Sequence, residues 1–175
     1  PDGFTASTQD ITNLQAGTYT VTVHDAACTR TQSWNVIDPA PLSVSLSPAI
    51  LPFGQNIACY GGSTGSINGI ISGGTGPYTV SWTGPGGFTS AKPNISGLIA
   101  GSYTIAITDA HGCSTTASTA LSESPAISFT ASTTANVLCY GANIGAASSS
   151  VSGGIPPYAY SWNSSPAQTT ANAGG

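Results

Sequence analysis

The sequence predicts an all-β chain made of tandem β-sandwich units, and three observations carry this prediction. The first is internal repetition: 11 of 24 positions are identical between 59–82 and 139–162, and 12 of 27 between 1–27 and 85–111. The second is composition, because Ser and Thr supply 48 of the 175 residues while Lys and Arg number only 2 and Met is absent. Such a chain is poor in helix formers. The third is a strict alternation of apolar and polar residues in short segments.

The alternating segments are expected to be half-buried strands. In 103–108 the large apolar residues all fall on one face, and 19–23 repeats that pattern. The segments 78–82 and 158–162 alternate in the same way and each ends in Trp, while 42–46 opens a further strand. Gly and Pro clusters bound these runs, as is typical of turns between strands. The alternation argues for folded structure and against disorder.

The spacing of the repeats divides the chain into one complete unit and two halves. Matches recur at 80 and 84 residues, a period that exceeds a solenoid repeat and suits a small domain of about 84 residues. Residues 1–41 then form the C-terminal half of a unit, 42–125 a complete unit, and 126–175 an N-terminal half. We expect each half to be completed by further copies of the repeat, in the same chain or in neighbouring subunits of a fibre.

Two features point to an immunoglobulin-like sandwich. Trp82 ends an alternating strand where such folds carry a core Trp, and the run from Leu98 to Tyr103 is typical of a tyrosine corner. The position on the apolar face favours a core role for Trp82 over a sugar-stacking platform. The residues predicted to form the cores are Trp82, Tyr103, Leu98, Ile105, Ile107, Trp162 and Tyr19.

The combined motifs resemble a known family. Ser72-Gly73-Gly74 with Pro77-Tyr78 and Ser81-Trp82, followed by Leu98 to Thr104 and by 108–113, is similar to the SprB-type repeat of Bacteroidetes gliding-motility adhesins and related giant surface proteins. Modules of the PKD type share part of this pattern but usually follow the Trp with a different turn. The resemblance covers nearly the whole chain. It implies immunoglobulin-like units in a long cell-surface filament, exported by a type IX secretion route.

Charge and hydropathy exclude several classes of partner. Two basic residues cannot provide an electrostatic grip on nucleic acid or anionic lipid. No apolar run approaches the length that inserts into a membrane. The cysteine pair of each repeat and a surface rich in hydroxyls favour an oxidising compartment. We therefore expect an extracellular protein at the cell surface.

The four cysteines allow two kinds of disulfide. A bridge within the complete unit would join Cys59 to Cys113, and bridges across junctions would join Cys28 to Cys59 and Cys113 to Cys139. The bridge within the unit is the first candidate. An immunoglobulin topology is awkward for it, because a Cys in the first loop and a Cys in the turn before the last strand tend to lie at opposite ends, but a modified first strand would relieve this. All four could also be free thiols, so the pairing stays open.

No catalytic, metal or cofactor site is predicted. His24 corresponds to Thr108 in the next copy and His111 to Ala27, so neither histidine recurs as a catalytic residue would. Asp25 and the corresponding Asp109 do recur, before Cys, where a turn aspartate bonds its own backbone. One carboxylate cannot supply the oxygen ligands of calcium. The chain is not expected to be an enzyme.

Two functions remain, and both are extracellular. The preferred one is a structural and adhesive repeat region of a surface filament or adhesin stalk, with Pro-stiffened linkers such as 38–41. The alternative is an array of carbohydrate-binding modules that contact surface polysaccharide through Tyr60 and Tyr140. Rings that are exposed and arranged coplanar would favour sugar binding, and buried rings would favour the structural function.

Overall fold

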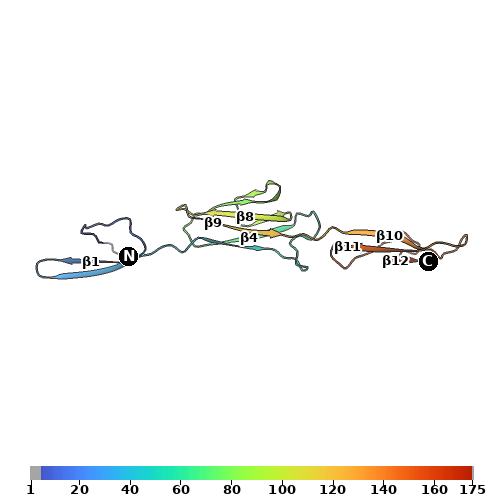
Figure 1. Cartoon of the computed structure of the whole chain (residues 1–175), viewed down its shortest axis with the longest axis horizontal. Coiled ribbons are helices and arrows are strands. Elements are labelled where there is room, and N and C mark those ends of the chain that lie inside the picture. The colour runs from blue at the N-terminus through green and yellow to red at the C-terminus, as the bar shows by residue number, and fades with distance from the viewer. Residues whose placement is uncertain (1–4, 175) are drawn as a thin grey trace.

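A computed structural model of the chain describes residues 5–174 and contains strands, turns and one short 3-10 helix, so the prediction of an all-β chain is confirmed. Figure 1 shows three β bodies that follow one another along the long axis. The elements are β1 (Gly17–His24), β2 (Thr29–Val36), β3 (Ser43–Pro48), β4 (Gly65–Ser72), β5 (Thr79–Thr83), η1 (Pro85–Gly87), β6 (Thr89–Ser90), β7 (Ile95–Leu98), β8 (Gly101–Thr108), β9 (Ser114–Leu121), β10 (Ser128–Ala135), β11 (Ala146–Ser152) and β12 (Asn172–Gly174).

The central body, built from β3 to β9, is a two-layered sandwich. One sheet has the strand order β3-β4-β7 and the other β6-β5-β8-β9, with antiparallel neighbours throughout. Strand β3 also contacts β9 of the opposite sheet, which closes one side of the sandwich. This division of seven strands into three and four is that of an immunoglobulin-like fold.

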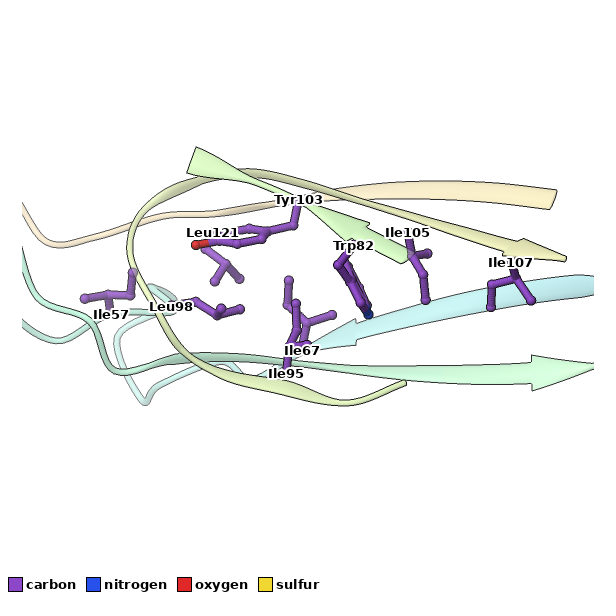
Figure 2. Close-up of a cluster of buried hydrophobic side chains, with 9 residues drawn as sticks. All are labelled: Ile57, Ile67, Trp82, Ile95, Leu98, Tyr103, Ile105, Ile107 and Leu121. Carbon is purple, nitrogen blue, oxygen red and sulfur yellow. The ribbon is translucent and has the colours of Figure 1, made fainter. Parts of the chain in front are cut away.

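The core of the central body follows from the alternation of its strands. Successive side chains of β8 point to opposite faces, so Tyr103, Ile105 and Ile107 enter the space between the sheets together. Burying each such side chain is worth roughly 1.5–3 kcal/mol. Figure 2 shows the complete cluster of nine buried residues: Ile57, Ile67, Trp82, Ile95, Leu98, Tyr103, Ile105, Ile107 and Leu121.

The two end bodies contain fewer strands. The N-terminal body is the hairpin β1–β2, in register from Gly17 opposite Val36 to His24 opposite Thr29. The C-terminal body is the sheet β10-β11-β12. The strand expected at 158–162 is reduced here to a single bridge between Trp162 and Gln168. Its counterpart β5 pairs with β8, and within residues 126–174 the structure describes no strand equivalent to β8.

The central sandwich has two ends that matter for the sites below. We call the end where β3 begins the entry end; it carries the loop 73–78 and the β8–β9 turn 109–113. The opposite end, which we call the exit end, carries the loop 49–64 and the segment 122–125 that leads to the C-terminal body.

Candidate functional site

The Trp that recurs in each repeat is a core residue in the central body. Trp82 is fully buried, and its indole N–H donates to the Lys92 carbonyl oxygen at 2.9 Å. In the C-terminal body the indole of Trp162 donates to Thr170 at the same distance, although that side chain is only half-buried. Because the Trp82 ring is buried, it cannot stack on a sugar. Any aromatic platform for sugar binding would have to come from other residues.

A tyrosine corner forms in the central body and in the N-terminal body. The Tyr103 hydroxyl donates to the Ile99 carbonyl at 3.0 Å, and the Tyr19 hydroxyl to the Gln15 carbonyl at 2.9 Å. Burial raises the pKa of Tyr103, because the phenolate would lose its hydration, and only the neutral phenol can donate this bond. The corner therefore fixes the start of β8, and Tyr19 occupies the same position in β1.

Both recurrent aspartates bind backbone N–H groups. Asp109 is buried and accepts from Thr75 at 3.1 Å and from His111 and Cys113 at 2.9 Å. Burial by itself raises the pKa of Asp109, but the three backbone donors outweigh it and lower the pKa overall. The N–H groups of Ala27 and Cys28 likewise lower the pKa of Asp25.

These aspartates have a structural role in their turns. Within residues 5–174 no group of three or more His, Cys, Asp or Glu side chains is placed to hold a metal ion. Asp109 also joins the β8–β9 turn to the loop at 73–78, since Thr75 belongs to that loop. The carboxylate thus ties together the two segments that form the entry end.

The geometry is incompatible with a Cys59–Cys113 bridge inside one unit. Cys59 lies at the exit end and Cys113 at the entry end, separated by the length of β8. Eight residues of strand span about 25 Å, whereas the two Cα atoms of a disulfide lie within about 7 Å. The two thiols are kept apart by the topology of the sandwich, which places their loops at opposite ends.

The cross-junction pairs do not meet within one chain either. Cys28 lies in the turn of the β1–β2 hairpin, which points away from the linker to the central body. Cys139 lies in the loop between β10 and β11, at the far end of the C-terminal body. Each proposed partner, Cys59 or Cys113, is likewise at the distant end of its own body. All four cysteines are exposed free thiols.

The entry end grips the linker through a pair of glycines. The Gly74 N–H donates to the Ala40 carbonyl at 2.7 Å, and a Cβ placed on Gly73 would lie 2.0 Å from the Pro41 oxygen. The second copy repeats this contact, with a Cβ on Gly153 only 1.9 Å from the Ala126 oxygen. Sequence reasoning interpreted these glycines as turn residues. Their recurrence in both copies, separated by two residues from the Pro-Tyr that follows, was the signal for a linker contact.

The exit end holds the loop that contains Cys59 against the outgoing segment. The Asn56 side chain accepts from the Ser122 N–H at 2.8 Å, and the Glu123 carboxylate accepts from the Gly61 N–H at 2.6 Å. Ile57 pairs with Glu123 in a parallel bridge and is fully buried. Neither Asn56 nor Glu123 was singled out from the sequence, because the partners lie more than 60 positions apart.

The tyrosines of the Cys-Tyr-Gly loops are exposed. The side chain of Tyr60 is 67 % exposed, and that of Tyr140 is fully exposed. Both follow a cysteine in the loop after the first strand of their body. Ring faces open to solvent can stack on a sugar, so the exposure that carbohydrate binding requires is present at both rings.

Comparison with protein families agrees with these features. The SprB repeat model matches residues 55–87 and 131–167, which include the Cys-Tyr-Gly loop, the glycine pair and the core Trp of each copy. No curated protein matches the chain. Among residues 5–174 there is no helix long and apolar enough to cross a membrane. The SprB repeat is a repeat family of cell-surface proteins and not an enzyme family. The SprB repeat model thus matches the chain at two places, as its motifs predict.

Proposed function

We propose that the chain is a structural and adhesive region of an extracellular cell-surface filament or adhesin stalk, without catalysis. The observation that carries this proposal is the succession of β bodies along one axis, joined by short linkers (Figure 1). A molecule arranged in this way spans distance, and its length grows with each added unit.

The linkers are held and not free. The glycine contacts at 73–74 and 153–154 fix the incoming chain against the entry end of each body. Pro39 and Pro41 restrict the backbone of the first linker further. A linker that is both short and bound transmits orientation from one body to the next, as a stalk requires.

The chemistry of the exposed surface supports an extracellular location. Hydroxyl side chains dominate the exposed faces of β2, β9 and β10, and the chain has only eight charged residues. Such a surface stays hydrated over a wide range of salt, because ion screening has little charge to act on. The family resemblance adds gliding motility and type IX export to the proposal. Antibody labelling of intact cells, with and without that export route, tests whether the chain reaches the cell surface by type IX export.

Solution scattering of Gly73→Ala tests the stalk. Gly86→Ala is the matched control, because Gly86 has a similar positive φ of 65° but open space around it. Both variants bear the strain of a Cβ at positive φ. We expect only Gly73→Ala to change the maximum dimension, because its methyl group displaces the linker. A compact particle for the wild-type chain, or equal shapes for both variants, would contradict the stalk.

Exposure of Tyr60 and Tyr140 favours a second candidate, carbohydrate binding. Replacing both by Ala removes two open ring faces and should weaken binding to surface polysaccharide by about 10-fold or more, given about 1–1.5 kcal/mol per aromatic contact. Phe53→Ala is the control, since Phe53 is an exposed aromatic in the loop that also contains Tyr60. Polysaccharide binding that is absent, or equal in all variants, leaves only the structural function.

A further inference from the structure

We propose that the central body carries a latch at its exit end that resists pulling along the axis of the stalk. The latch consists of the contacts between residues 56–61, in the loop after β3, and the outgoing segment 122–124. A stalk between two surfaces is pulled at both ends, so this mechanical function rests on the stalk proposed above and deepens it. What the latch adds is resistance to force in one direction, supplied by identified residues.

The central body is built so that a pull along the stalk follows its first and last strands. Tension would enter through the linker before β3 and leave through the segment after β9, toward the C-terminal body (Figure 1). Strand β3 begins at the entry end, and β9 ends at the exit end. Because interstrand hydrogen bonds lie across the strands, a pull along a strand strains all of them together instead of one after another.

The outgoing segment runs beside the loop after β3, in the same direction. Every strand ladder that the structure describes is antiparallel, and the single parallel pairing among the described residues joins Ile57 to Glu123. The N–H groups of Asn56 and Ile57 donate to the Ser122 carbonyl at 3.0 and 3.1 Å. The Ser124 N–H donates to the Ile57 carbonyl at 3.3 Å. When the outgoing segment is pulled it must slide along this neighbour, so these bonds are strained together.

Side chains join the latch to both of the pulled strands. The Asn56 Oδ1 atom accepts from the Ser122 N–H at 2.8 Å and from the Ser122 hydroxyl at 3.2 Å. The Nδ2 group of the same amide donates to the carbonyl of Ala49, the residue directly after β3, at 2.7 Å. The Glu123 carboxylate accepts from the Gly61 N–H at 2.6 Å, and a charged acceptor makes the stronger kind of hydrogen bond. Asn56 therefore connects the end of β3 to the segment that continues β9.

The centre of the latch is shielded from water. Ile57 is fully buried, Ser124 is 2 % exposed and Asn56 is 8 % exposed. Figure 2 shows Ile57 at the same end of the core as Leu121, the last residue of β9. Gly65 lies against both, because a Cβ placed on it would be 2.7 Å from Leu121 and 3.3 Å from Ile57. Hydrogen bonds in such surroundings are stronger than in water, and the outgoing segment cannot leave without opening the core.

The polar groups and the glycine of the latch recur in the sequence of the flanking repeats. The recurring pairs are Asn56 with Asn136, Gly61 with Gly141, and Glu123 with Asp38. The neighbours of the carboxylate are less constant, since Glu123 lies between two serines and Asp38 between Ile37 and Pro39. An amide, a glycine and a carboxylate at these positions favour a function that each repeat performs, and tension along a stalk acts on every repeat.

The latch should control how fast the central body opens under force. Forced unfolding depends on the rate constant of unfolding and not on the equilibrium stability alone. Contacts that are lost in the transition state slow this rate when they are present in the folded state. The outgoing segment is the first part of the body to receive a pull from the C-terminal side, so its contacts belong to this class.

Single-molecule pulling of the full chain, held at its two termini, tests the latch. The step in which 42–125 extend together reports the opening of the central body. We expect Asn56→Ala to open about 10-fold faster at constant force, because two hydrogen bonds from Ser122 lose their acceptor. Asn94→Ala is the matched control and should open at nearly the wild-type rate. Its amide accepts from the Gly69 N–H at 3.2 Å on the β7 side of β4, away from both pulled strands.

Glu123 provides a second test that does not depend on the folding of Asn56→Ala. We expect Glu123→Ala to open faster than the wild type, and Glu123→Gln, which keeps an oxygen to accept from Gly61, to recover most of the difference. Either alanine variant of the latch that folds and yet opens no faster than Asn94→Ala would overturn the proposal. That result, with a wild type that is extended in solution scattering, would leave the stalk in place.

Discussion

A few side chains in each body perform tasks that its strands alone cannot. Trp82 fills the centre of the core and satisfies its own N–H, and the Tyr103 hydroxyl fixes the turn before β8. The Asp109 carboxylate accepts hydrogen bonds from three backbone N–H groups at the entry end, and Gly73, which has no side chain, lets the linker approach closely. With so few charged residues in the chain, hydrogen bonds to the backbone take the place of ion pairs.

Replacing Trp82 by Ala should destabilise the central body by about 3–5 kcal/mol. The change leaves a cavity between the sheets and an unpaired Lys92 carbonyl. Urea unfolding followed by circular dichroism measures this loss. Thr83→Ala, at the exposed neighbouring position, should change stability by less than about 0.5 kcal/mol. Equal effects of the two substitutions would place Trp82 outside the core.

Asp109→Asn should weaken the acid sensitivity of the central body. The pKa of Asp109 is lower in the folded chain than in the unfolded chain, so the carboxylate stabilises the fold above about pH 4. That stability is lost as the pH falls through the folded pKa. The difference in unfolding free energy between wild type and variant should therefore be largest near pH 7 and shrink toward about pH 2.5.

Urea titrations at these two pH values measure the effect of Asp109→Asn. Asp10→Asn, which changes an exposed carboxylate before β1, serves as the control. A difference between wild type and Asp109→Asn that stays constant over this pH range would show that the carboxylate charge does not contribute.

At the scale of elements, an alternating segment becomes a regular strand only when a partner is present. The segments 78–82 and 158–162 have the same pattern, yet only the first forms a strand, β5. Strand β5 pairs with β8, whereas among the described residues the segment 158–162 has only the bridge from Trp162 to Gln168. Unpaired backbone groups in the second segment remain exposed to water, as at any sheet edge.

Trypsin tests the hairpin. The chain has only Arg30 and Lys92, and Pro93 after Lys92 blocks cleavage, so denatured and reduced chain should be cut once, after Arg30. Arg30 lies in β2 opposite Val23. Backbone hydrogen bonds withhold the extended conformation that a protease binds, so native chain should stay intact. Mass spectrometry of timed digests measures both reactions. Rapid native cleavage would mean that β2 opens readily.

At the scale of the whole molecule, stability is unevenly distributed. The central body encloses a core between two sheets, whereas each end body has a single layer of strands with an open apolar face. A two-stranded hairpin has marginal stability in water. Of the described residues, those of the central body should therefore be the last to unfold.

Hydrogen exchange at low chain concentration should reveal this difference. Amides of β8 and β9 should exchange more than about 100-fold more slowly than those of β1 and β2, although the two ladders have the same register. Mass spectrometry of peptic fragments measures the rates. Equal protection of the two ladders would contradict an open hairpin.

The sequence by itself determined the local features of this protein. Alternation predicted the strands, because a period of two needs only neighbouring residues. The motif around Tyr103 predicted its corner, whose hydrogen bond spans four positions. The repeat predicted tandem units, and its motifs pointed to the family whose model matches two stretches of the chain. Each of these inferences depends on residues close together or on identity at a fixed spacing.

The tertiary structure alone decided what depends on distant residues meeting. The topology separates Cys59 from Cys113 by the length of a strand, which spacing along the chain could not show. The bond from Gly61 to Glu123 and the approach of Gly73 to the linker join segments that no local pattern connects. The open faces of the end bodies became visible only against a filled core, because burial is a property of the packed sandwich and not of the strand.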